Sequence, residues 1–305
     1  MLDKSRSLTV DCVAYDLEDS VTKAQKPAAR SAIHNFLGKP RAQNIREQAV
    51  RINAVETGLA LDDLTEVLKA PNLDTLVLPK CQSASDLHFV SDVIKHLLPS
   101  RHPSSPTTSD QPPPLKVLAL IESARALSDL SSICKATPTL LQGLIFAAED
   151  FALDLSMTRT PSLTEFLYAR SAIVIAARAH NLPSAIDLVC TQYEVYKDDA
   201  KWDYMKRECE GGKALGFNGK QIIHPNQIEL AHGIFAPGMA ELEWAVRCVI
   251  ADKKAEEQGR GAWTLDGKMI DAPVSGKARA ILERARACGK DVEELMERWK
   301  GQEPE

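Results

Sequence analysis

The fold of this chain is decided by the stretch KVLALIESA (116–124), in which an apolar run ends on the acidic residue Glu122. Apolar runs of four to six residues are typical of parallel strands that are covered on both faces. A helix-like sequence follows the run, as in a repeating strand–helix unit. The stretch therefore predicts one buried strand of an α/β fold, with Glu122 at the point where the strand ends.

Four further segments have the same form, a buried run that ends on charged or polar residues. They are DCVAYDLEDSV (11–21), AVRIN (49–53), TLVLPK (75–80) and LIFAAEDF (144–151). Two shorter strands are predicted at SAIDLV (184–189) and GKQIIHP (219–225). These segments recur every 25 to 42 residues or so, roughly the rhythm of a barrel of alternating strands and helices. We therefore expect an α/β fold of the TIM (β/α)8-barrel type in which an eighth strand, the usual first one, is not visible.

Helix-like stretches separate the strand segments. We expect helices over 22–38, 58–70, 83–98 and 163–182. Ser83 or Asp86 is placed to begin the third helix, and Gly38 and Asn181 are placed to end the first and the last. The alternation of strands and helices predicts that residues 1–235 form the barrel.

Two segments depart from this rhythm. PSRHPSSPTTSDQPPP (99–114) is rich in Pro, Ser and Thr, so it cannot bury a core, and it is predicted to be a flexible surface insertion. The second segment, residues 236–305, is predicted to be a C-terminal helical extension with a Gly-rich turn at 259–274. The chain is thus divided into a barrel and a smaller helical part.

Composition excludes several classes of function. The net charge of −5 and the pI near 5.9 argue against nucleic acid as a partner. No apolar run approaches the roughly 20 residues of a membrane span. The seven cysteines are scattered, with no C-x-x-C pair, which predicts reduced thiols in an intracellular protein. No signal peptide or other targeting segment is visible at the N-terminus.

The strand ends carry a set of charged residues. In an α/β fold the carboxyl ends of parallel strands meet on one face, where ligands bind. We expect these side chains to gather at one mouth: Glu18, Asp19, Arg51, Lys80, Glu122, Glu149 and Asp150. The sequence therefore predicts an active site at this face.

Glu122 and Asp150 end neighbouring strands of the predicted sheet. Mg²⁺ prefers carboxylate oxygens and usually takes only one or two protein carboxylates beside waters and substrate oxygens. With no His or Cys beside them, the two acids favour Mg²⁺, with Mn²⁺ as the alternative, over Zn²⁺. The alternative interpretation is that both acids are helix caps or solvated loop charges.

The other charged residues each allow two interpretations. Strand alternation sends Asp16 and Glu18 one way and Asp19 the other, so an inward acid either supports a metal or caps the next helix. Arg51 lies within an apolar strand and needs a partner, which is either an anionic substrate or Glu18. Lys80 either supports the acidic cluster or contacts a phosphate.

With these residues in place, the chain resembles the citrate lyase beta subunit-like proteins of the HpcH/HpaI aldolase superfamily. The resemblance rests on DLEDSV, VRINA, LVLPK, IESA, FAAEDF, AIDLV, GFNGKQIIHPNQI and GKMIDAP, in order and at suitable spacing from about residue 10 to residue 275. Within the superfamily the chain is most similar to the group that handles citramalyl-CoA and malyl-CoA.

The resemblance implies a TIM barrel, a homotrimer and a Mg²⁺-dependent lyase that makes or breaks carbon–carbon bonds between an acyl-CoA and a 2-oxo acid. It also implies a mitochondrial location, a C-terminal extension that packs on a neighbouring subunit, and thioesterase activity when water captures the thioester. The implied metal ligands are Glu122 and Asp150. The implied catalytic residues are Arg51, Glu18 and Asp271, the last acting in a neighbouring subunit's site, and the implied substrate-binding residues are Arg51, Lys80, Glu122 and Ala148. Without the resemblance, Asp271 is interpreted as a turn residue before Pro273.

The chain departs from the family pattern at two places. Nothing in it matches the first strand and its V-P-G-like motif, so we expect the barrel to be open at one seam. The small residues before Glu-Asp are Ala147 and Ala148 in place of a glycine pair or Gly-Ala, which adds a methyl group near the site. These departures keep two alternatives open. One is a non-catalytic, truncated relative that binds acyl-CoA and metal, and the other is a citrate lyase beta subunit that acts on an acyl-carrier protein.

Overall fold

The computed structural model describes residues 2–104, 112–192 and 199–305. The chain divides into two units, Met1–Ile228 and Glu229–Glu305. The sequence analysis placed this boundary after residue 235. Part of the predicted surface insertion, residues 105–111, lies outside the described residues. The described ends of the insertion are held to each other, because Arg101 Nε donates to Pro113 O at 3.0 Å and Leu115 N donates to Arg101 O at 2.9 Å.

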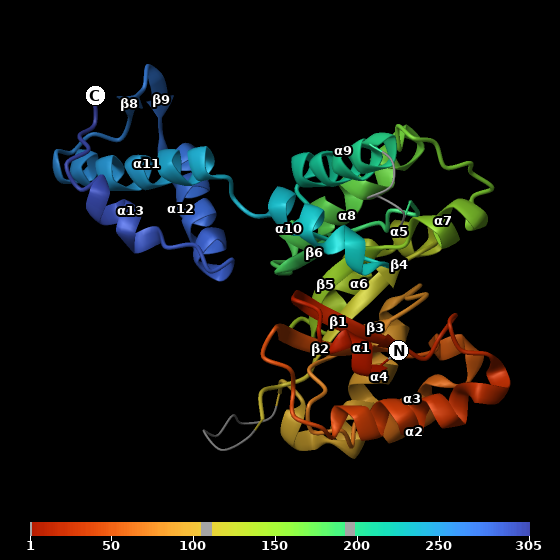
Figure 1. The fold of residues 1–305 in the computed structure, drawn as a ribbon. Helices are drawn as coiled ribbons and strands as arrows, with labels where there is room; N and C mark the ends of the chain where they lie inside the picture. Colours follow the sequence, from red (N-terminus) through yellow and green to blue (C-terminus); the bar gives the residue numbers. More distant parts are fainter. Residues whose placement is uncertain (1, 105–111, 193–198) are drawn as a thin grey trace. The chain divides into compact units, whose positions relative to one another are not determined.

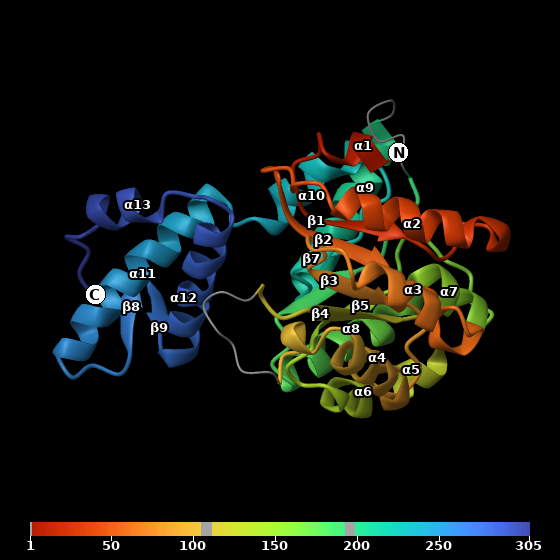
Figure 2. The same cartoon turned by 90° about the horizontal axis from the view of Figure 1, so that it is seen from below.

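The first unit is built on one sheet of seven parallel strands (Figures 1 and 2). The strands are β1 (Val10–Asp16), β2 (Ile45–Arg51), β3 (Thr75–Leu78), β4 (Lys116–Ile121), β5 (Leu141–Phe146), β6 (Ser184–Asp187) and β7 (Gly219–Lys220). They pair in chain order from β1 to β7, every pair parallel. Each of the seven predicted strand segments overlaps one of these strands, although β1, β2 and β5 begin before the predicted segment and β7 is only Gly219–Lys220. The prediction of an α/β fold with this sheet is therefore confirmed.

The closed eight-stranded barrel is not observed among the described residues. The sheet curls but ends at β1 on one side and at β7 on the other, and each of these strands pairs with one neighbour only. The consequence is visible in β1, where Asp11, Cys12 and Ala14 are exposed, whereas all four residues of β3 are buried. An edge strand has no covering neighbour, which explains this difference.

Helices pack against the outer face of the curled sheet (Figure 2). The helices of this unit are α1 (Leu2–Ser5), α2 (Lys26–Leu37), α3 (Ala60–Val67), α4 (Ala84–Leu97), α5 (Ala124–Ser128), α6 (Leu130–Ala136), α7 (Ala148–Asp154), α8 (Leu167–Ala179) and α9 (Asp199–Leu215). Neighbouring contacts run from α2 through α3, α4 and α6 to α8. On the inner face a small apolar cluster fills the curl, formed by Ala49, Val77, Leu118, Leu120 and Ile145.

The helix ends for which the sequence analysis named a capping residue agree with the structure. Ser83 and Asp86 form a reciprocal capping box at the start of α4, which satisfies backbone N–H groups that the helix cannot pair itself. Asn181 follows α8 with φ +55°, the left-handed conformation that often ends a helix. Gly38 caps α2, its N–H donating to His34 O at 3.0 Å.

The second unit has its own apolar core. Its elements are α10 (Ile228–Phe235), which begins at the unit boundary, α11 (Met239–Glu257), the hairpin of β8 (Trp263–Leu265) and β9 (Lys268–Ile270), α12 (Ala272–Ala287) and α13 (Val292–Arg298). The hairpin corrects the prediction of a Gly-rich turn at 259–274. Asp266 and Gly267 both have positive φ, +50° and +73°, as a two-residue hairpin turn of this kind requires. Among the described residues, we find no helix with the length and apolarity needed to span a membrane.

Candidate active site

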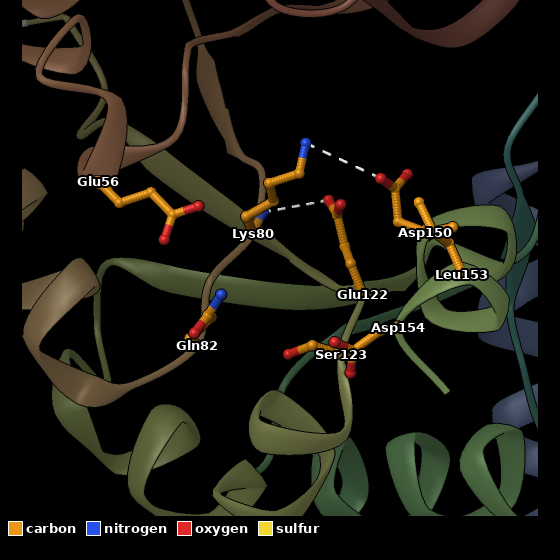
Figure 3. Close-up of a pocket in the computed structure, with 8 residues that line it drawn as sticks. All are labelled: Glu56, Lys80, Gln82, Glu122, Ser123, Asp150, Leu153 and Asp154. Atoms are coloured by element: carbon orange, nitrogen blue, oxygen red, sulfur yellow. Dashed lines mark hydrogen bonds and ion pairs between the residues drawn. The ribbon is translucent and has the colours of Figure 1, made fainter. Parts of the chain in front are cut away.

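A pocket of about 250 Å³ opens where the chain leaves β3, β4 and β5 (Figure 3). It is lined by Glu56, Lys80, Gln82, Glu122, Ser123, Asp150, Leu153 and Asp154. Two of these polar groups already have backbone partners, since Ser123 Oγ accepts from Ala126 N at 3.1 Å and Asp154 Oδ2 accepts from Ala124 N at 2.8 Å. The carboxylates of Glu122 and Asp150 point into the pocket, and Lys80 contacts both of them from one side (Figure 3).

Glu122 follows β4 directly and is 5% exposed. Its Oε1 accepts a hydrogen bond from Lys80 N at 3.1 Å. Burial, together with the negative charges of Asp150 and Glu18, raises the pKa of Glu122 to about 7 against the opposing effect of Lys80. A buried carboxylate with such a pKa lacks enough positive charge around it, and a cation would favour its ionised form.

Asp150 reaches the pocket from the first turn of α7. The sequence placed Glu149 at the same mouth, and this is wrong: Glu149 Oε1 binds Arg159 NH1 at 2.5 Å and does not line the pocket. Arg159 is anchored in turn by Val189 O at 3.0 Å and by Glu208 at 2.5 Å. The pair Glu149–Arg159 therefore fixes the start of α7, and of the two neighbouring acids only Asp150 lines the pocket.

Lys80 joins three acids, of which Glu122 and Asp150 line the pocket and Glu18 does not. Its Nζ lies 3.1 Å from Glu18 Oε1 and 3.8 Å from Asp150 Oδ1, while its backbone N–H holds Glu122. Burial raises the pKa of Glu18 above its ordinary value, although Arg51 and Lys80 oppose this. Of the two sequence interpretations of Lys80, support of the acidic cluster is the one that the geometry shows.

Arg51 binds three acids that follow one another along the chain. Its Nε and NH2 donate to Asp16 Oδ1 and Oδ2, both at 2.7 Å, and NH1 lies 2.9 Å from Glu18 Oε2 and 3.5 Å from Asp19 Oδ2. The expectation that alternation would separate these acids is wrong, because β1 ends at Asp16 and the chain then turns around the guanidinium. Burial opposes ionisation of Asp16, but hydrogen bonds from Arg51 and from backbone N–H groups lower its pKa to about 2.

The donor set fits a hard divalent cation. Glu122 and Asp150 supply carboxylate oxygens to one cavity, and Glu122 is ionised only at the expense of burying an unbalanced charge. Within residues 2–104, 112–192 and 199–305, no three His, Cys, Asp or Glu side chains gather as a complete metal site. A cation here would therefore take its remaining ligands from water and substrate, as Mg²⁺ commonly does.

Four of the predicted catalytic and substrate-binding residues do not line the pocket, namely Glu18, Arg51, Ala148 and Asp271. Ala148 is the first residue of α7, is 1% exposed and does not line the pocket. Asp271 belongs to the second unit, where its Oδ1 accepts from Val274 N at 3.2 Å and so caps α12, with Pro273 in the first turn. Within one chain, the structure thus shows the structural role that the sequence alone had indicated for Asp271.

The sequence analysis missed two features of the site, the pairing of Asp16 with Arg51 and the presence of Glu56. Asp16 is the main partner of Arg51, and a signal for it existed, because the two residues are directly opposite in the parallel register of β1 and β2. Glu56 lines the pocket from the short 3-10 helix Val55–Thr57 that follows β2, where no strand-end rule points to it. Its side chain extends toward the pocket from the side opposite Asp150 (Figure 3).

Comparison with known proteins gives consistent matches over nearly the whole chain. Residues 1–225 match the family model described as HpcH/HpaI aldolase/citrate lyase. The chain is 35% identical to citrate lyase subunit beta of Haemophilus influenzae, covering 94% of this chain and 93% of that protein. It is 33% identical to mitochondrial citramalyl-CoA lyase of Homo sapiens, covering 91% and 79%. A solved structure of the protein CitE from Mycobacterium tuberculosis, in complex with magnesium, acetoacetate and coenzyme A, matches with a TM-score of 0.67 and 28% identity over 91% of each chain.

Proposed function

The chain belongs to the HpcH/HpaI aldolase/citrate lyase family, and on that premise we propose that it is a Mg²⁺-dependent lyase acting on a CoA thioester. The substrate that we propose is citramalyl-CoA or malyl-CoA, cleaved to acetyl-CoA and a 2-oxo acid. One observation carries the proposal: Glu122 and Asp150 face one pocket at the strand ends, and Lys80 contacts both of them. Magnesium and coenzyme A are bound together by the similar CitE protein, which supports this choice of cofactor and substrate class.

In this proposal each charged residue of the site has a distinct role. Glu122 and Asp150 would hold Mg²⁺, which supplies Lewis-acid polarisation of substrate oxygens when bound. Arg51, with a side chain 26% exposed, stabilises negative charge on substrate oxygens while Asp16 fixes its plane. Glu18 contacts both Arg51 and Lys80, so it positions the two cations that face the substrate.

The proposed reaction also needs a proton donor. The substrate hydroxyl loses its proton to water, the oxygen forms the ketone of the 2-oxo acid as the carbon–carbon bond breaks, and the electron pair left on the acetyl carbon takes up one proton, so that the protons balance. We assign this last proton to Asp271 of a neighbouring copy in a homotrimer, and a mitochondrial location belongs to the same proposal. In the chain itself, support comes from Asp271 standing at the start of α12 in a unit separate from the pocket.

Mixing two inactive variants tests the shared site. Asp150→Asn removes one proposed metal ligand, and Asp271→Asn removes the proton donor, so each variant alone should be inactive. Co-expression at equal levels in a trimer should restore about one quarter of wild-type activity, since about one site in four combines the two intact residues at random. Activity that stays at zero in the mixed trimers would contradict a site completed by a second subunit.

A matched pair of variants tests the metal ligand itself. Asp150→Asn should lower turnover of citramalyl-CoA by at least about a hundredfold, since it weakens binding of the metal that would stabilise the negative charge developing on the substrate oxygens. Asp154→Asn is the control, because Asp154 lines the same pocket but its carboxylate is bound to Ala124 N. Equal turnover by wild type and Asp150→Asn would refute the assignment.

The open sheet favours a second candidate, a non-catalytic protein that binds acyl-CoA and metal without turnover. The similarity to citrate lyase subunit beta favours a third, a lyase that acts on a thioester of an acyl-carrier protein. A folded wild-type protein that binds Mg²⁺ but leaves all free CoA thioesters intact would favour one of these two. Turnover after addition of the acyl-carrier thioester would then distinguish the third from the second. Release of CoA without carbon–carbon cleavage would instead identify a thioesterase.

A further inference from the structure

Lys80 has a backbone conformation that is uncommon for lysine. The chain leaves β3 at Leu78 and passes through Pro79, and Lys80 then adopts φ +46°, in the left-handed region. This conformation is unfavourable for a residue with a Cβ atom, because the Cβ atom crowds the following carbonyl oxygen. The fold therefore holds Lys80 in place against a local preference, and the contacts of the residue show what this achieves.

The turn at Lys80 directs two groups of one residue at different acids. The backbone N–H points at Glu122 Oε1, 3.1 Å away, while the side chain reaches Glu18 Oε1 at 3.1 Å and Asp150 Oδ1 at 3.8 Å. These acids come from segments that are far apart in the sequence, after β1, after β4 and in α7. The ammonium thus lies among the carboxylates that the proposed function assigns to a metal, as Figure 3 shows for Asp150 and Glu122.

The charges around the ammonium are unequal. Glu18, Glu122 and Asp150 carry the negative charge, and the cations within ion-pair distance of them in the described residues are Lys80 and Arg51, of which Arg51 is also bound to Asp16 and Asp19. Lys80 is accordingly the cation nearest to Asp150. Its side chain is 32% exposed, so the ammonium has solvent to move into when another cation takes its place.

From this geometry we propose that Lys80 is an internal counter-ion that competes with the divalent cation for Asp150. In the metal-free protein its ammonium balances Asp150 and Glu18, and it must leave Asp150 when a divalent cation binds there. The displaced ammonium remains attached to the pocket wall and is then free to meet an anionic group of the substrate. This inference rests on the proposed metal site and adds that binding of metal and movement of Lys80 are coupled.

Calorimetric titration with Mg²⁺ alone tests the competition without relying on activity. Lys80→Met keeps the backbone N–H on Glu122 and most of the side-chain volume but removes the charge. We expect it to bind Mg²⁺ at least about tenfold more tightly than wild type, because a positive charge no longer opposes the ion. Lys80→Arg is the matched control, since it keeps the charge and should bind with about the wild-type affinity. In the absence of metal, Lys80→Met should unfold at lower urea than wild type, and saturating Mg²⁺ should restore more stability to it than to wild type.

Each outcome of the titration bears on one claim. Tighter binding by Lys80→Met but not by Lys80→Arg, or detectable binding by Lys80→Met alone, supports the counter-ion. If wild type binds Mg²⁺ and Lys80→Met binds equally or more weakly, or if both variants bind more tightly, the counter-ion is refuted while the metal site stands. If neither wild type nor Lys80→Met binds Mg²⁺, while urea unfolding shows both to be folded, the proposed metal site fails and the inference with it.

Discussion

Replacing Arg51 by methionine removes the guanidinium that joins β2 to the turn after β1, while keeping a side chain of similar length. The pKa of Asp16, about 2 against an ordinary 3.8, measures how strongly its surroundings favour the charged form. At about 1.36 kcal/mol per pKa unit, the favourable contacts outweigh burial by about 2 kcal/mol. Glu18 would also lose its contact with Arg51 NH1 at 2.9 Å. We therefore expect Arg51→Met to lower the free energy of unfolding at pH 7 by about 2–3 kcal/mol, close to the range for breaking a largely buried ion pair.

Urea unfolding of a double-mutant cycle measures this coupling. Arg51→Met, Asp16→Asn and the double variant should give a coupling free energy of at least about 1 kcal/mol, because each single change leaves the other partner buried without its charge. Arg46→Met is the matched control, since Arg46 pairs across the same two strands with Asp11 at 3.8 Å, but both side chains are more than half exposed. An exposed pair of this kind contributes about 0–1 kcal/mol.

The pH dependence of stability supplies an independent check. The pKa of Asp16 is lower in the folded than in the unfolded protein, so its contribution is present above pH 3.8 and is lost as the pH falls toward about 2. Asp16→Asn should therefore flatten the loss of stability over this interval. The reasoning is refuted if Arg51→Met costs no more than Arg46→Met, or if the effects of Arg51→Met and Asp16→Asn simply add.

Three more predictions concern Glu122 and Gly143. Burial raises the pKa of Glu122 to about 7, so below pH 7 Mg²⁺ must displace a proton from this carboxyl group. The Mg²⁺ affinity measured by calorimetry should therefore fall about tenfold for each pH unit below 7. A constant affinity between pH 5 and 7 would contradict this. In the metal-free protein, this raised pKa should make stability fall as the pH rises from 4.5 to about 7, a slope that Glu122→Gln should remove. Gly143→Ala should cost about 1–3 kcal/mol in urea unfolding, because a Cβ there would lie 2.5 Å from Ser184 Cβ, whereas Gly211→Ala, with open space around it, should cost nothing measurable.

The sheet was predictable because its strands are local in sequence. An apolar run of a few residues that ends on a charge has few alternatives in an α/β chain, and all seven such segments became strands. The same rule brought Lys80, Glu122 and Asp150 to one pocket, since parallel strands end on one face. What the sequence analysis established was thus the parallel sheet and the face on which the site lies.

The partners of individual charges could not be predicted in this way. Glu149 and Asp150 are neighbours in sequence, yet Glu149 binds Arg159 and Asp150 lines the pocket. The difference arises because the segment after α7 brings Arg159 beside Glu149. Asp16, Glu18 and Asp19 share Arg51 because the strand ends at Asp16, and a one-residue shift of that end would rearrange all three. The β8–β9 hairpin was within reach of the sequence, because Asp266–Gly267 is a strong hairpin signal.

The central claim is that Glu122 and Asp150 serve a metal-dependent carbon–carbon cleavage. The most direct measurement is turnover of citramalyl-CoA by the purified chain, following pyruvate and acetyl-CoA, with Mg²⁺ and then with EDTA. We predict that both products appear in equal amounts with Mg²⁺ and that EDTA abolishes their formation. Equal rates with Mg²⁺ and with EDTA, or no products from a folded protein that binds Mg²⁺, would contradict the claim.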